Sequence, residues 1–103
     1  MNDPKEQVML LVRYQLKEGE REAFLHAVEE QRIISRTLEE KGCLSYEYSL
    51  PLDADQTVCL QELWETAEAQ AAHMKQPHFA VLTELKQRYV KNTDIRKYLV
   101  RAF

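Results

Sequence analysis

A histidine and a carboxylate are the residues of this sequence best suited to proton chemistry. Glu62 lies between Leu60 and Trp64 in an otherwise apolar strand pattern, so its carboxylate is expected in a cleft or buried against a partner. His73 follows two alanines, which leave room beside its ring for a ligand. Imidazole titrates near neutrality and a buried carboxyl can have a raised pKa. We therefore predict His73 and Glu62 as catalytic residues, with a purely structural role as the alternative for each.

Aromatic side chains nearby are candidates for binding a ring-shaped substrate. Trp64 and Tyr46 follow strand patterns, and each is either a core residue or one wall of an aromatic pocket. His78 and Phe79 come directly after Pro77, where we expect a break between two helices. Since broken helices often border cavities, these residues are predicted to line a substrate pocket together with Trp64 and Tyr46.

Arg13 is unusual in an apolar strand, and we include it among the predicted pocket residues. It is expected either to pair with Glu47 or Glu62 or to attract an anionic ligand. His73 and His78 stand on either side of a proline at a spacing that matches no zinc motif, so no metal site is expected. The sequence also lacks a GxSxG motif, a dinucleotide fingerprint and a P-loop, which argues against nucleotide or flavin cofactors.

Composition limits the classes of protein further. The chain has 103 residues, of which 45% are hydrophobic and 30% charged, and its net charge is -3. This favours a single domain over residues 1–103, with a core of about residues 8–100. Without a basic run we expect no nucleic-acid partner, and without a long apolar segment no membrane or secretory segment, which indicates a cytoplasmic protein. Cys43 and Cys59 are expected as reduced thiols, and their distance from each other stays open.

The elements that must position these residues follow from the apolar periodicity. Strands are predicted at 8–16, 43–50, 57–65 and 95–100, and helices at 20–41, at 67–75 and from 77 onward. Gly42 and Thr66 are expected to end and begin helices. The order βαββαβ predicts an α+β, ferredoxin-like antiparallel sheet with its helices on one face. The first strand is apolar in both phases, so we expect a homodimer in which the bare sheet faces pair.

Three short motifs resemble those of the antibiotic biosynthesis monooxygenase (ABM) domain family. The segment 41–48, KGCLSYEY, is similar to the family's GC-x-x-Y strand, and 62–66, ELWET, to its E-x-W strand end. The segment 72–79, AHMKQPHF, resembles its helix break before a PHF sequence. The resemblance covers about residues 8–100 in the same order. Each motif is short, but the set with these spacings is specific.

This resemblance implies a dimeric α+β barrel with a cleft in each protomer between the sheet and the helices. Family members include cofactor-independent monooxygenases that oxidise quinols or polyketide phenols, haem-degrading enzymes, and relatives that process a phosphorylated autoinducer. Glu62, Trp64, His73 and His78 match the family's recurring polar and aromatic positions. The first strand lacks the asparagine of the haem-degrading members, and His73 stands in the region of their tryptophan, which argues against haem chemistry.

The function expected from these features is oxidation of a small quinol or phenol by O2 without a cofactor. His73 would be the base or the partner of the phenol, and Glu62 would orient that histidine or take the proton. Trp64, Phe79 and Tyr46 would enclose the ring. The alternatives are a non-catalytic, small-molecule-binding or stress-linked dimer, and an isomerase-like relative that acts on a phosphorylated compound. The isomerase would need a cation in the cleft, for which Arg13 is the candidate.

Overall fold

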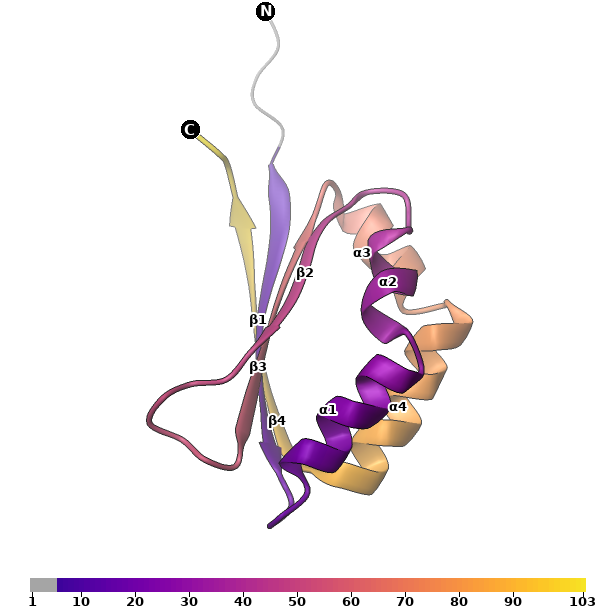
Figure 1. The fold of residues 1–103 in the computed structure, drawn as a ribbon. Helices are drawn as coiled ribbons and strands as arrows, with labels where there is room; N and C mark the ends of the chain where they lie inside the picture. Colours follow the sequence, from indigo (N-terminus) through magenta and orange to yellow (C-terminus); the bar gives the residue numbers. More distant parts are fainter. Residues whose placement is uncertain (1–5) are drawn as a thin grey trace, which may run out of the picture.

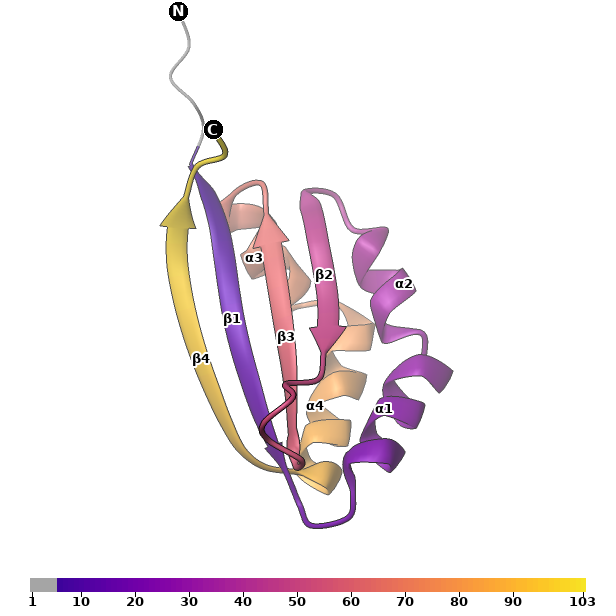
Figure 2. The same cartoon turned by 60° about the vertical axis from the view of Figure 1, so that its left-hand side comes forward.

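The computed structural model describes residues 6–103 and contains one antiparallel sheet with all its helices on one side (Figure 1). The strand order is β2-β3-β1-β4, which Figure 2 shows from another side. This is the α+β, ferredoxin-like fold predicted from the sequence. The elements in chain order are β1 Gln7–Leu16, α1 Arg21–Glu30, α2 Ile33–Leu38, β2 Cys43–Ser49, β3 Thr57–Trp64, α3 Ala67–His73, α4 Pro77–Tyr89 and β4 Val90–Val100.

The core lies between the sheet and the helices. Alternate residues of β1 are buried there, and so are their neighbours on β3, since successive side chains of a strand point to opposite faces. The helix-facing set on these strands comprises Val8, Leu10, Val12, Tyr14, Leu16, Val58, Leu60, Glu62 and Trp64. Glu62 is therefore the charged residue in a row of apolar side chains, as the strand pattern indicated.

The opposite side of the sheet, which we call the open face, is covered by none of the described helices (Figure 1). The register places Met9 beside Leu63 and Tyr98 there, and Leu11 one step further along β1. Leu11 and Tyr98 are exposed in the single chain. The predicted pairing of two open faces in a dimer stays a prediction, because the structure holds one chain.

The prediction of one long helix over 20–41 is wrong. The chain forms α1 and α2 instead, separated at Arg32, which has a left-handed backbone with φ of 58°. The apolar spacing continues across the break, because Val28 and Ile33 are both buried. Periodicity alone therefore could not reveal it, and no glycine or proline marks the position.

The last strand also begins earlier than the expected 95–100. β4 starts at Val90, directly after α4, and pairs with β1 along its length. The polar residues that suggested a turn lie instead on an edge strand, where side chains can remain in water. Asn92, for example, donates a hydrogen bond from Nδ2 to Oε1 of Gln15 at 3.2 Å.

Three predicted ends of helices or strands are confirmed, and they lie close to the residues of the candidate site. Gly42 has φ of 85° just before β2, and a Cβ added there would lie 2.6 Å from Cβ of Ala69 on α3. Thr66 caps α3 by accepting a hydrogen bond at 3.0 Å from the backbone N–H of Ala69. Pro77 opens α4. None of the described helices is both long and apolar enough to cross a bilayer.

Candidate functional site

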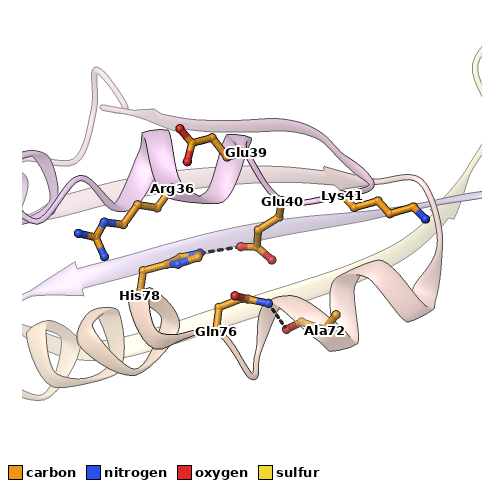
Figure 3. Close-up of a pocket in the computed structure, with 7 residues that line it drawn as sticks. All are labelled: Arg36, Glu39, Glu40, Lys41, Ala72, Gln76 and His78. Atoms are coloured by element: carbon orange, nitrogen blue, oxygen red, sulfur yellow. Dashed lines mark hydrogen bonds and ion pairs between the residues drawn. The ribbon is translucent and has the colours of Figure 1, made fainter.

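The centre of the site is a carboxylate held by two histidines. Nδ1 of His73 and Nε2 of His78 each lie 2.6 Å from the same oxygen, Oε2 of Glu40. A carboxylate accepts hydrogen bonds, so each imidazole donates its N–H at these positions. The contact between His78 and Glu40 is drawn in Figure 3. All three side chains are at least nine-tenths buried, with 2%, 9% and 9% of their surface exposed for His73, His78 and Glu40.

Three separate segments bring these side chains together. Glu40 follows α2 and lies two residues before Gly42, which directly precedes β2. His73 is the last residue of α3, and His78 is the second residue of α4. The short connection between α3 and α4 turns the chain at Pro77, so that the two imidazoles approach Glu40 from neighbouring helix ends.

Aromatic rings surround His73. Its ring centroid lies 4.8 Å from that of Trp64, 5.1 Å from that of Phe79 and 6.0 Å from that of Tyr46. Trp64 is 0% exposed and Tyr46 is 2% exposed. These rings pack closely on the imidazole rather than standing apart around an open cleft. The predicted residues Tyr46, Trp64, His73, His78 and Phe79 thus form one cluster.

Glu62 lies at the sheet side of this cluster. Its Oε1 accepts a hydrogen bond from Nε1 of Trp64 at 3.0 Å. Burial raises the pKa of Glu62, while the hydrogen bond from Trp64 and, when it is protonated, the imidazolium of His73 act in the opposite direction. A carboxyl of this kind can exchange a proton nearer to neutral pH than an exposed glutamate can.

The carboxylate bound to His73 is that of Glu40, not that of Glu62. The sequence analysis gave the orienting role to Glu62 and did not single out Glu40. Glu40 is one of several glutamates near the end of a predicted helix, and it stands 33 residues before His73. Its position just before the Gly42–Cys43 step was the one available signal, since that step directs the chain back to the sheet.

Two tyrosines of β2 extend the polar part of the cluster. The hydroxyls of Tyr46 and Tyr48 lie 3.0 Å apart and share a hydrogen bond. Burial is the main cause that raises the pKa of both phenols, which therefore remain neutral around physiological pH. They can donate or accept a hydrogen bond, but they are poor bases.

An open hollow of about 530 Å³ borders the site from the helix side, and Figure 3 shows its lining. Glu40 and His78 form part of its wall, so the carboxylate can be reached from solvent at this place. The other lining residues are Arg36, Glu39, Lys41, Ala72 and Gln76. His73 is not part of this lining, but it contacts both Glu40 and His78.

Arg13 does not belong to this cluster. Its neighbours along β1, Val12 and Tyr14, are buried toward the helices, so Arg13 points to the open face. Its Nη1 lies 3.7 Å from Sγ of Cys59, in place of the expected pairing with Glu47 or Glu62. The prediction that Arg13 lines the same pocket as His73 is therefore wrong, because the sheet separates them. Cys43 and Cys59 are both free thiols.

Known proteins of solved structure share this fold. The family model for antibiotic biosynthesis monooxygenase matches residues 7–84. No curated protein matches the chain. Among solved structures, a conserved Bacteroides thetaiotaomicron protein of unknown function, described as a possible oxidoreductase, is 26% identical, covers 93% of this chain and 99% of its own, and superposes with a TM-score of 0.83.

Two further structures are similar in fold at lower identity. A protein of Pseudomonas aeruginosa is 18% identical, covers 98% of this chain and all of its own, and has a TM-score of 0.86. A candidate antibiotic biosynthesis monooxygenase from Nitrosomonas europaea is 16% identical, covers 99% of this chain and 94% of its own, and has a TM-score of 0.81. With the family model matching most of its length, the chain belongs to the antibiotic biosynthesis monooxygenase family.

Proposed function

We propose that this protein is a monooxygenase that oxidises a small quinol or phenol with O2 and needs no cofactor for it. The observation that carries the proposal is the buried imidazole of His73, which is held by Glu40 and packed among Trp64, Phe79 and Tyr46. An apolar ring environment suits an aromatic substrate, and an imidazole held by a carboxylate is suited to accept its phenolic proton.

His73 is the proposed general base. Because its Nδ1 carries the proton that is donated to Glu40, the lone pair of the neutral ring is on Nε2. Nε2 accepts the phenolic proton, and Glu40 stabilises the imidazolium that results. Glu62, whose pKa is raised by burial, is the second proton acceptor.

The quinol itself supplies all the electrons that this reaction needs. Its anion transfers electron density to O2, one oxygen atom enters the ring, and the other leaves as water. The quinol also supplies the two further electrons, so that the product is a hydroxylated quinone. The protein contributes the base, the orientation and the exclusion of water. Access of the substrate requires the rings around His73 to separate, because His73 is only 2% exposed.

We further propose that two copies pair through their open faces. The exposed apolar side chains of Leu11 and Tyr98 support this, since a face with such residues is stabilised by being covered. A cytoplasmic location is part of the proposal, and the free thiols of Cys43 and Cys59 are compatible with a reducing compartment.

The test is oxygen uptake with a panel of hydroquinones, measured in the presence of a chelator. We expect turnover by the wild type and a loss of about 10²- to 10⁴-fold in His73→Ala, the usual range for removal of a general base. Glu62→Gln should lose less of the oxygen uptake than His73→Ala does. His26→Gln is the matched control, because His26 forms an exposed pair with Glu30 on α1. Uptake that is unchanged in His73→Ala would contradict the assignment.

The second candidate is a non-catalytic, small-molecule-binding dimer with the same cluster. The close packing of Trp64 and His73 favours it, since it leaves little room for a substrate in this conformation. Binding of a quinol without oxygen uptake would support it. The isomerase alternative relied on Arg13 as the cation in the cleft, and in that form it is not carried forward, because Arg13 points to the open face.

A further inference from the structure

We propose that Glu40, His73 and His78 form a binding site for a divalent transition-metal ion. Within the part of the chain that the structure describes, these three residues offer ligand atoms that all lie within 4.8 Å of one another. The inference is independent of the oxygenase proposal, because it concerns binding alone. It also departs from the expectation of no metal site, which was based on the spacing of the histidines without Glu40.

The donor atoms select the kind of ion. Two imidazole nitrogens and one carboxylate oxygen suit zinc and its neighbours cobalt, nickel, copper and ferrous iron. Calcium and magnesium prefer sites built from oxygen, and here only Glu40 supplies oxygen atoms. A set of three protein ligands also leaves coordination positions for water or another small ligand.

The three side chains can accept the ion after movements of up to about 1.5 Å. Both histidine nitrogens already converge on Oε2 of Glu40 at 2.6 Å. An ion about 2.0–2.1 Å from each donor holds those donors roughly 3 Å or slightly more apart. The carboxylate oxygen must therefore withdraw from each nitrogen by under 1 Å, and ligand atoms that now lie as far as 4.8 Å apart must approach each other by up to about 1.5 Å. Each imidazole then carries its proton on the other nitrogen, and the cation replaces the two protons that now point at Glu40.

The surroundings provide both a wall and an access route. On one side, Trp64 and Phe79 pack on the ring of His73 and fix its orientation. On the other side, the hollow of about 530 Å³ reaches Glu40 and His78 from solvent. An ion can enter there, and water in the hollow can complete its coordination. The lining of the hollow includes a further carboxylate, Glu39, and the ammonium of Lys41.

The competing interpretation is that these residues form a hydrogen-bonded network and nothing more. Titration calorimetry with Zn²⁺, and Co²⁺ absorption in the visible range, distinguish the two on the full chain carrying no polyhistidine tag. We expect one ion per chain, with a dissociation constant in the micromolar range or tighter. Glu40→Gln and His78→Gln should weaken binding by at least about 100-fold, since loss of even an outer partner of a ligand costs about 10- to 100-fold.

His26→Gln is again the matched control and should bind as the wild type does. His26 also pairs with a glutamate, Glu30, but the two are exposed and lack a second histidine. Equal binding by the wild type, Glu40→Gln and His78→Gln would overturn the proposal, as would the absence of saturable binding by the wild type.

A second measurement avoids variants that fail to fold. In the wild type, the imidazole nitrogen resonances of His73 and His78 should shift when Zn²⁺ is added, while those of His26 should stay in place. A shift of His26 alone would refute the site. No substrate is present in these experiments, so their outcome does not depend on oxygenase activity. If both proposals hold, Zn²⁺ suppresses oxygen uptake, because metal on Nδ1 of His73 leaves the proton on Nε2.

Discussion

Polar side chains on the two faces of the sheet differ in their burial and in their partners. On the helix side, Glu62 is buried, and its carboxyl is tied to the indole of Trp64 on the same strand. On the open face, Asp94 and Arg96 form a loose ion pair at 3.6 Å in which both side chains are largely exposed. A buried polar group must find a partner inside the protein, whereas an exposed one has water. Polar residues on the helix side therefore carry more information about function.

The largest expected difference between the faces is in packing energy. Leu60→Ala removes a side chain that is 1% exposed and should lower the free energy of unfolding by about 2–5 kcal/mol. Leu11→Ala, the same change on the open face, removes a side chain that is 38% exposed and should cost less than about 1 kcal/mol. Urea denaturation of both variants at low protein concentration measures this. Equal costs would mean that the open face is covered even in the single chain.

A pair of glycines tests how closely the helix layer lies on the sheet. Gly42→Ala should destabilise by about 1–3 kcal/mol, because its φ is positive and the new Cβ meets that of Ala69 at 2.6 Å. Gly19 also has a positive φ, but nothing lies within 4 Å of a Cβ added there. Gly19→Ala should therefore lower the free energy of unfolding by about 1–2 kcal/mol. Thermal melts compare the two. A Gly42→Ala variant no less stable than Gly19→Ala would argue against close contact of α3 with this junction.

The open face has a test of its own in the state of assembly. Leu11→Glu places a charge at the proposed dimer contact and should raise the dimer dissociation constant by about tenfold or more, equivalent to about 1.4 kcal/mol. Sedimentation over a range of concentrations measures this. Leu52→Glu, on the fully exposed loop between β2 and β3, is the control and should leave assembly unchanged. If Leu11→Glu assembles as the wild type does, the dimer does not form through this face.

The smallest expected effect is the change in stability with pH that the titration of Glu62 causes. Burial raises its pKa in the folded state, so the folded protein holds this proton more tightly than the unfolded chain does. The contribution of Glu62 to the stability of the wild type should fall as pH rises from about 4, the ordinary pKa range of glutamate, toward neutrality. Glu62→Gln keeps an oxygen that can accept the hydrogen bond from Trp64. Because its amide does not titrate, this variant does not show the decrease in stability that Glu62 causes as pH rises. Its stability relative to the wild type should therefore increase with pH, and a relative stability that falls instead would contradict the burial effect.

Local signals in the sequence predicted several boundaries of the elements. Gly42, Thr66 and Pro77 each mark a boundary through their own backbone or capping chemistry, and the alternation along β3 placed Glu62 and Trp64 on one face. Such signals are carried by the residue itself and its immediate neighbours, so one sequence is enough to read them.

Relations between distant segments could not be read in this way. Glu40 reaches His73 because the break at Arg32 and the turn at Gly42 set the direction of α2, and neither feature encodes a partner 33 residues away. Arg13 shows the reverse error. It lies on the same strand as core residues, but a strand with two apolar phases does not tell which phase faces the helices until the helices are placed.

The strand order β2-β3-β1-β4 has a consequence for synthesis on the ribosome. β1 is made first, yet it lies inside the sheet between β3 and β4, which emerge much later. At a translation rate of about 5–20 residues per second, β1 waits for several seconds without a partner on either edge. Its apolar side chains, and the cluster around Glu40, find their places only when the second half of the chain has been made. A nascent-chain protease assay should therefore show protection of β1 only after β3 has left the exit tunnel.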